Sequence, residues 1–556
     1  MSRTSSSLGW RLSLLLLLLA GTLAWLYRSS ELAKRPMHTD EANLGMKTLA
    51  LWKSGHFQYD KHEHHGPLLH YSTVGVGRLL GWTSDTVTEE NLRLVSAIYG
   101  MGLIVVAMLL ADVISLTGCA FAALFIAVSP MMTYYSRYYI METPLVFFCG
   151  LLIASLWRWS QSKNFLWLLL AGFSLGAMHA TKETCVLNLA AMAAACVAAS
   201  ITGRFFSKRS NGYLFRDSKP NFTTASIVVP LVALVVSGAL YSNFFKDLPY
   251  VRDSFLTYES YLARSAGSGH EKPLNYYFML LFWGKNNLHV WTEALIGGLA
   301  VIGILSAFLN TRRPAPHRTF LIILSVYAVA LLVIYSLIPY KTPWSILGVD
   351  HALALLAGVG VASLYNLFQW PLIRVLLTIG LTMGIYNLCK QTSLATDFNK
   401  EPRAIYSAHD LNPYVYSHTT PKLVDLARQI HQLAALHPDG NKMPVQIIQS
   451  ESGWPLPWYL RDMPNVGYQT EIPAKLDAAV IIMDQDRQDA VLSLLTPRAV
   501  PIDDLETFVG PPEPPRKPQP IYESIASCSL RPGVVMSVLV EKTIWTKLQE
   551  MQKAGQ

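Results

Sequence analysis

Charged residues are scarce in this sequence: Asp, Glu, Lys and Arg make up 15% of its 556 residues, whereas hydrophobic residues make up 51%. Soluble domains carry about 25% charged residues, so this composition, with a mean hydropathy of +0.29, indicates an integral membrane protein. The net charge of +8 does not point to nucleic acid, because membrane proteins concentrate Lys and Arg in their cytoplasmic loops. We therefore expect a lipid bilayer and no nucleic acid among the partners.

Cysteine and nucleotide-binding motifs are also lacking. The six cysteines form no CxxC pair and no zinc-type spacing, and most of them lie in apolar segments, where they behave as small core residues. The sequence contains neither GxGxxG after a strand nor GxxxxGK[ST], which argues against a nucleotide-bound substrate.

What the sequence has instead is long apolar runs. A membrane core of about 30 Å needs roughly 20 mostly apolar residues in a helix. Runs that meet or approach this length lie at 10–27, 95–111, 117–133, 143–157, 165–180, 184–202, 224–243, 289–309, 319–338, 345–365 and 371–388. The sequence thus predicts a polytopic α-helical membrane protein with about 11 transmembrane helices. The first run also has the basic start and Ala-rich end of a signal peptide, so its cleavage stays open.

The positive charges predict the orientation. The loops at 204–222 and 311–318 are rich in Lys and Arg and are therefore expected in the cytoplasm. Counting single crossings from them places the N-terminus in the cytoplasm and the first loop, 28–94, outside. Hydropathy falls after about residue 390, and a helix over 421–437 with strands at 445–450, 478–486 and 534–542 predicts an extracytoplasmic α/β domain. We expect two domains, 1–390 and 391–556.

Two adjacent carboxylates, Asp40 and Glu41, follow the first apolar run. Such a pair can supply a general base, an orienting group or a metal ligand. The simpler interpretation is a helix start, with Thr39 as the N-cap and the acids in the first turn, where they favour the helix dipole. The two interpretations are compatible, because a helix N-terminus also suits a phosphate-bearing ligand.

The stretch YDKHEHHGPLLH raises the question of a metal. It is not an HExxH motif, because Gly66 stands where the second His would be needed. His62 and His65 could share a divalent ion on a helix, but Gly66 and Pro67 break a helix there. A polar lining of a substrate loop is the favoured interpretation; a divalent metal stays open, and no cofactor is certain.

Three cations lie near predicted span ends on the outer side. Lys182 and Lys341 each flank apolar runs, and Arg137 lies among four tyrosines in YYSRYY. They suit an anionic lipid headgroup, because a phosphate near a bilayer surface needs Lys or Arg partners. Snorkelling anchors and an aromatic belt explain them as well.

Several segments together resemble a known family. They are HTDEANLGMKTLALWKSG, SPMMTYYSRYYIMETPLVFF, GAMHATKET, YSLIPYKTPW, NPYVYSHTTP and WPLPWYLRD. The chain resembles a prokaryotic flippase-activity-associated family of multi-spanning proteins of the GT-C type, similar to protein O-mannosyltransferases and to the lipid A aminoarabinose transferase. The resemblance covers most of the chain and implies a glycosyltransferase that uses a polyprenyl-phosphate sugar.

The resemblance also implies roles for particular residues. The expected catalytic residues are Asp40, Glu41 and Glu142; the expected donor-phosphate ligands are Arg137, Lys182 and Lys341; the expected substrate-loop residues are His65, Tyr340 and Trp344. The aminoarabinose transferase has Glu-Lys-Pro where this chain has His65, Gly66 and Pro67. Its lysine is absent here, so His65 or another cation must substitute for it.

The sequence therefore predicts a glycosyltransferase of the plasma (inner) membrane with an extracytoplasmic C-terminal domain. Asp40 would take a proton from a glycan, lipid or protein hydroxyl as it attacks the anomeric carbon, which inverts that carbon. The cations would stabilise the departing phosphate. A lipid-linked sugar transporter, a flippase-associated protein without transferase chemistry and an assembly scaffold are the alternatives. The sugar and the acceptor stay undetermined.

Overall fold

The structure is a computed structural model that describes residues 2–63, 65–207, 222–265, 270–285, 290–396, 412–450, 453–495, 522–531 and 534–554. It divides into two compact units. The first comprises Met1–Lys34 and Lys47–Tyr416, and the second comprises Arg35–Met46 and Ser417–Gln556. The sequence predicted the domain boundary near residue 390; the first unit runs on to Tyr416, and the second unit also takes in the short segment that carries Asp40 and Glu41.

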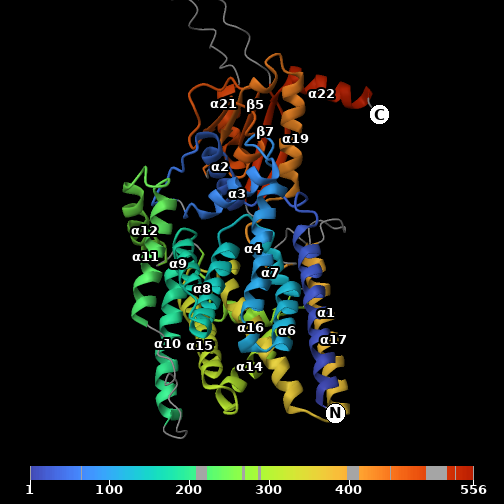
Figure 1. The fold of residues 1–556 in the computed structure, drawn as a ribbon. Coiled ribbons are helices and arrows are strands. Elements are labelled where there is room, and N and C mark those ends of the chain that lie inside the picture. The colour runs from blue at the N-terminus through green and yellow to red at the C-terminus, as the bar shows by residue number, and fades with distance from the viewer. Residues whose placement is uncertain are drawn as a thin grey trace, which may run out of the picture. The chain divides into compact units, whose positions relative to one another are not determined.

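The first unit is helical (Figure 1). Its helices are α1 (Ser2–Ser29), α3 (Leu68–Leu80), α4 (Glu89–Leu109), α5 (Ala111–Ile114), α6 (Leu116–Val128), α7 (Pro130–Ser136), α8 (Glu142–Ser162), α9 (Phe165–His179), α10 (Cys185–Ser207), α11 (Phe222–Tyr241), α12 (Pro249–Ser265), α13 (Tyr276–Phe282), α14 (Ala294–Leu309), α15 (Ala315–Leu337), η1 (Pro343–Ile346), α16 (Leu347–Leu367) and α17 (Pro371–Thr396). Helix α2 (Thr39–Ser54) runs from the second unit into the first, and β1 (Gly284–Lys285) pairs with β2 (Val290–Trp291).

Every predicted apolar run contains a helix, but fewer of them than predicted could span a bilayer alone. In the described ranges, eight helices are long and apolar enough to cross a membrane, or nine if α6 and α7 form one bent span. Helices α9 and α14 are shorter, with 15 and 16 residues, and Glu293 directly precedes the second. At 1.5 Å per residue, such helices fall short of about 30 Å. The chain is a multi-pass membrane protein.

The bend between α6 and α7 measures 61° and has a local cause. Ser129 leaves the helical conformation and caps α7 by accepting a hydrogen bond from the Met132 N–H, and Pro130 at the first position of α7 has no N–H to continue α6. The exposed carbonyls at the end of α6 are satisfied from elsewhere: Arg28 donates to the carbonyls of Ile126 and Ala127. Such partners are needed because a helix leaves its last carbonyls unpaired.

Close packing between helices depends on glycine at a few positions. A Cβ on Gly303 of α14 would lie 2.1 Å from the Leu356 carbonyl oxygen of α16, and one on Gly360 would lie 2.0 Å from the Leu299 carbonyl oxygen. Only residues without a Cβ allow backbones to approach this closely, an arrangement typical of membrane helix pairs.

The second unit contains a five-stranded sheet in the order β4-β3-β5-β7-β6. The strands are β3 (Val445–Ile448), β4 (Val466–Gln469), β5 (Val480–Asp484), β6 (Tyr522–Arg531) and β7 (Val534–Glu541), and the helices are α19 (Pro421–Leu436), α20 (Leu456–Tyr459), α21 (Gln488–Leu495) and α22 (Lys542–Ala554), with η2 (Gly440–Lys442) and η3 (Gln485–Arg487). β4, β3 and β5 are parallel, and β7 and β6 are antiparallel. The predicted helix and strands of this α/β region are confirmed.

Each face of this sheet packs against its own apolar cluster. Val445, Ile447 and Ile482 face the cluster that includes α19 and α22, while Ile448 and Ile481 face the cluster that includes α21. The alternation follows from the two-residue period of strands. Because both faces are covered, the central strands are apolar almost throughout, as parallel strands usually are.

Residues 208–221, which hold most of the predicted basic cytoplasmic loop, and His64 lie outside the described residues.

Candidate functional site

Helix α2 begins at Thr39, and its N-terminus is capped by His38 rather than by Thr39 as predicted. The His38 Nδ1 accepts a hydrogen bond from the Asp40 N–H at 3.1 Å, and the Glu41 Oε2 accepts one from the His38 N–H at 2.9 Å. This is the reciprocal arrangement of a capping box, with a histidine in place of the usual serine or threonine. The turn that carries both acids is therefore fixed locally.

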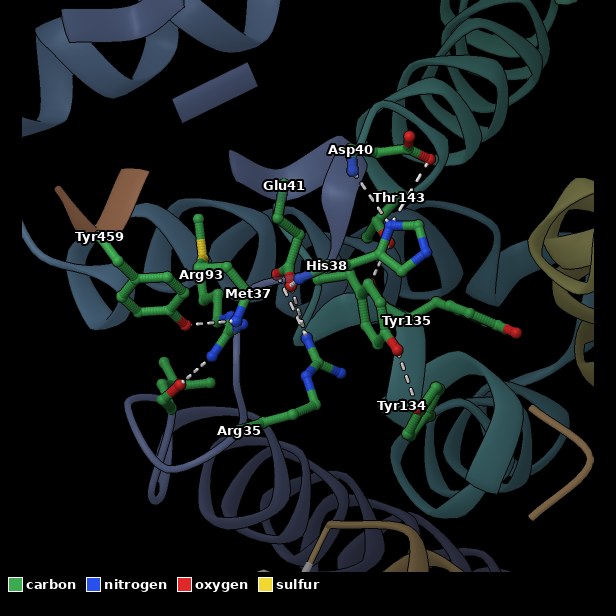
Figure 2. Close-up of polar contacts among 12 residues, drawn as sticks. Arg35, Met37, His38, Asp40, Glu41, Arg93, Tyr134, Tyr135, Thr143 and Tyr459 are labelled. Atoms are coloured by element: carbon green, nitrogen blue, oxygen red, sulfur yellow. Dashed lines mark hydrogen bonds and ion pairs between the residues drawn. The ribbon is translucent and has the colours of Figure 1, made fainter. Parts of the chain in front are cut away.

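The two neighbouring acids have different environments (Figure 2). Glu41 is fully buried, and Arg35 donates to its two carboxylate oxygens at 3.2 and 3.3 Å. The Asp40 side chain is 52% exposed, and its carboxylate lies 3.7 Å from the His38 Nδ1. A buried, paired carboxylate holds structure, whereas an exposed one can meet a substrate. Of the two, Asp40 is the acid that is open to solvent.

The loop before α2 is also held within the second unit. The Tyr459 hydroxyl accepts a hydrogen bond from the Met37 N–H at 2.7 Å, and the His38 ring stacks on that of His418 at 6.0 Å. These contacts explain why this short segment groups with the C-terminal residues, which the sequence could not indicate.

In the first unit, Lys182 and Glu142 form an ion pair. Glu142 begins α8, and Lys182 lies between α9 and α10, so two loops forty residues apart bring the pair together. The pair lines a small cavity with Thr184, Asn188, Tyr335 and Trp344, large enough for about one water molecule. Three of the residues predicted to act, Glu142, Lys182 and Trp344, thus meet at one place.

The next residue, Glu183, is buried and extends this polar group. The His65 Nδ1 lies 2.9 Å from the Glu183 Oε2 and 2.7 Å from the Tyr261 hydroxyl of α12. Burial alone would raise the pKa of Glu183, but His65 and its hydrogen bonds outweigh burial and lower it. Burial alone would lower the pKa of Lys182, but Glu142 and Glu183 outweigh burial and raise it. Both groups are therefore held in their charged forms.

The described residues give little support to a metal site. The His62 Nδ1 lies 3.2 Å from the Ser260 hydroxyl, whereas His65 faces Glu183, so the two histidines have different partners. Within the described ranges, no group of three or more His, Cys, Asp or Glu side chains is placed to hold a metal ion. These residues do not fit a divalent ion, and no step of the chemistry is assigned to one.

Lys341 is buried between α15 and η1. Its ammonium donates to the carbonyls of Ile338 at 2.6 Å and Lys272 at 3.1 Å. Of its neighbours, Tyr340 is half-exposed with its ring 5.0 Å from that of His270, and Trp344 packs edge-on against Tyr135. Trp344 of this segment therefore lines the cavity beside Glu142 and Lys182, whereas Lys341 binds backbone carbonyls.

Arg137 is buried after α7 and also binds backbone. Its guanidinium donates to the Tyr27 carbonyl of α1 at 2.7 Å and reaches the Thr396 carbonyl of α17 at 3.5 Å. These contacts tie the ends of two helices together, which favours a structural role.

The predicted set omitted several polar residues that the structure brings together. The Ser129 hydroxyl lies 2.8 Å from the Glu293 Oε1 and 3.0 Å from the Asp350 Oδ2, all three buried at the bend between α6 and α7. A detectable signal was an acid within each of the apolar runs 289–309 and 345–365, since acids there are expensive and usually functional. For Glu183, the signal was an acid directly after Lys182.

Comparison with solved structures identifies the fold of this chain. The chain matches the crystal structure of ArnT from Cupriavidus metallidurans bound to undecaprenyl phosphate, with a TM-score of 0.59 and 15% identity, over 95% of this chain and 98% of that one. It matches the oligosaccharyltransferase AglB from Archaeoglobus fulgidus, in complex with an inhibitory peptide and a dolichol-phosphate, with a TM-score of 0.51 and 12% identity, over 87% of this chain and 70% of that one. The fold is therefore that of the GT-C membrane glycosyltransferases.

The sequence adds a family similarity over part of the chain. Residues 73–246 match the family model of the dolichyl-phosphate-mannose-protein mannosyltransferases. No curated protein matches the chain significantly. The resemblance to GT-C proteins predicted from the motifs is confirmed.

Proposed function

We propose that this protein is a membrane glycosyltransferase that transfers a sugar from a polyprenyl-phosphate donor to a hydroxyl acceptor at the extracytoplasmic face, with inversion. The observation that carries the proposal is Asp40, an exposed carboxylate on a rigid helix start in a chain with the GT-C fold. The solved relative with the same fold over nearly its whole length holds undecaprenyl phosphate, which supports a donor of this class.

Asp40 is the proposed base. Its backbone N–H is bound by His38 and the following turn is fixed by Glu41, so the backbone that carries the carboxylate is held in place while about half of the side chain stays exposed to an acceptor. A positioned carboxylate that takes the acceptor's proton as the carbon–oxygen bond forms lowers the barrier by general-base catalysis. Glu41 then serves as a positioning residue.

Lys182 is the proposed phosphate ligand. Its charge is secured by Glu142, and because an ammonium has three N–H donors, the ion pair does not prevent binding to a phosphate oxygen. His65 pairs with Glu183, the residue that follows Lys182, and is the proposed replacement for the missing lysine. Lys341 and Arg137 rank below Lys182, because both donate to backbone carbonyls.

The proposed setting is the plasma (inner) membrane, with the N-terminus in the cytoplasm and the C-terminal unit outside. The support is the excess of Lys and Arg in two loops that the apolar runs 224–243 and 289–309 separate, with the second run counted as a crossing although its helix α14 has only 16 residues.

One observation favours the alternative of a lipid-linked sugar transporter. The span α6–α7 is broken at Ser129, next to the buried acids Glu293 and Asp350. Broken helices with buried polar groups are typical of substrate and ion sites in transporters.

The test is transfer of radiolabel from a panel of polyprenyl-phosphate sugars to membrane acceptors by the purified protein in nanodiscs. Asp40→Asn should abolish transfer without loss of folding, and Asp85→Asn, a matched exposed acid of the same predicted loop, should leave it unchanged. Undiminished transfer by Asp40→Asn would remove the proposed base. Absence of transfer from every donor, with movement of lipid-linked sugar across the bilayer, would establish the transporter instead.

A further inference from the structure

The second unit has the strand arrangement that creates a ligand crevice in open α/β sheets. The chain runs from β3 to β4 on one side and then crosses to β5 on the other side of β3, and the three strands are parallel. In open α/β sheets, ligands bind in a crevice at the point where the strand order reverses. The crevice lies outside the carboxyl ends of the two strands that flank this point. Here that position lies beyond the ends of β3 and β5.

Gln449 and Asp484 lie at this position. Ile448 of β3 pairs with Met483 of β5, so the following residues, Gln449 and Asp484, are register neighbours whose side chains point to the same face. The Gln449 side chain is 3% exposed, and among the described residues neither its oxygen nor its nitrogen has a hydrogen-bond partner. A buried amide left unpaired is unfavourable, so it points to a ligand that completes its hydrogen bonds.

One carboxylate oxygen of Asp484, Oδ2, is bound by neighbouring residues. Its Oδ2 accepts hydrogen bonds from the Ser450 N–H and hydroxyl, both at 2.7 Å, and lies 3.9 Å from the Arg487 Nε. In the described part of the chain, the hydrogen bonds to Asp484 all reach Oδ2. Its Oδ1 is therefore left as an acceptor on the strand next to that of Gln449.

An aromatic ring borders the same place. Tyr468 of β4 pairs with Ile447 of β3, shares the face of Gln449 and is 42% exposed. Gly453 lies against both: a Cβ there would be 3.1 Å from the Gln449 Oε1 and 3.5 Å from the Tyr468 ring. The glycine therefore leaves space at the edge of the amide.

We propose that Gln449, Asp484 and Tyr468 form a binding site for a neutral pyranose sugar. An amide that both donates and accepts, next to a carboxylate that accepts, matches two adjacent sugar hydroxyls, each of which donates and accepts. The ring of Tyr468 offers an apolar surface to the C–H face of the sugar. The negative charge of Asp484 disfavours a phosphate or another anion, although Arg487, 3.9 Å from its Oδ2, offsets part of that charge. The site consists of residues other than the proposed transferase residues and does not depend on their activity.

The experiment is saturation-transfer NMR of the full chain in nanodiscs with methyl glycosides of mannose, glucose and galactose, and with inorganic phosphate as the competing probe. We expect at least one glycoside to bind in the millimolar range. Gln449→Leu should weaken binding about tenfold, the equivalent of one or two lost hydrogen bonds, and should leave the melting temperature unchanged or raised because an unpaired amide is removed.

Gln446→Leu is the matched control, because it changes the same residue type on the opposite face of β3 and should leave binding unchanged. Asp40→Asn should also retain binding, which separates this site from the transferase site. The proposal is overturned if no glycoside binds, if phosphate displaces the glycoside, if Gln449→Leu binds as the parent does, or if Gln449→Leu lowers the melting temperature clearly. The last result would mean that the amide has a structural partner.

Discussion

The Glu41→Gln variant tests whether Glu41 stabilises the fold rather than taking part in transfer. Glu41 is fully buried and forms an ion pair with Arg35, whose side chain is also almost fully buried. Removing one partner of a buried ion pair costs about 3–5 kcal/mol, because the other charge is left without compensation. The second unit has about 150 residues, and a domain of this size loses about 2–4 °C of melting temperature per kcal/mol. We therefore expect Glu41→Gln to lower the melting temperature of this unit by roughly 6–12 °C at the lower estimate of the cost.

The assay is thermal unfolding of the nanodisc-embedded protein, followed by tryptophan fluorescence, with transfer activity measured on the same samples. Asp40→Asn is the matched comparison: its side chain is half-exposed, so its stability should change by less than about 0.5 kcal/mol while transfer is lost. Replacing both partners, Arg35→Met with Glu41→Leu, should recover most of the stability, because no charge stays buried. Equal melting temperatures for Glu41→Gln and the parent would refute this account, and so would a loss of stability in Asp40→Asn as large as in Glu41→Gln.

Three further predictions concern the first unit. Lys182→Met combined with Glu142→Gln, which removes both charges of the ion pair, should reduce transfer roughly 10- to 100-fold, as expected for a lost charged hydrogen bond to phosphate, while exposed Lys163→Met should not; equal activity would exclude Lys182 as a ligand. The pKa of Glu183 is lowered in the folded protein, so its charge stabilises the fold above the ordinary pKa of 4.5, and this stability is lost as the pH falls through the lower folded pKa. Thermal melts below pH 4.5 should show this loss, and Glu183→Gln should make the melting temperature depend less steeply on pH. Gly303→Ala should destabilise the α14–α16 contact by about 1–3 kcal/mol in thermal melts, whereas Gly298→Ala, whose added Cβ meets no atom within 4 Å, should be neutral; similar melts for both would contradict the packing argument.

The sequence predicted the elements better than their contacts. All eleven apolar runs contain helices and the C-terminal α/β elements are present, because hydrophobic periodicity within a segment decides which element forms. It overestimated the spans at α9 and α14, where the apolar run is longer than the helix inside it. It also could not show that Arg35–Met46 would group with the C-terminal unit, since that depends on distant residues such as Tyr459.

The candidate site was predicted in its residue types but not in its pairings. The convergence of Glu142 and Lys182 joins loops forty residues apart, and no spacing in the sequence encodes it. The neighbours Gln449 and Asp484 become visible only through the register of β3 with β5. The N-cap was misassigned to Thr39 because residue preference favours threonine over histidine, whereas the actual cap depends on where the backbone turns.

Charge placed near a membrane surface therefore does not by itself identify a functional residue; its partners do. Arg28, Arg137 and Lys341 bind backbone carbonyls, where a cation satisfies helix ends and loops that would otherwise be unpaired. Lys182 instead pairs with a carboxylate at the edge of a small cavity, and two of its three N–H donors stay outside that pair. The same rule divides the two acids at the start of α2: Glu41 is held on all sides by Arg35 and His38, and Asp40 keeps its carboxylate open. Residue type selected these candidates, and the neighbours of each one decide which are available for chemistry.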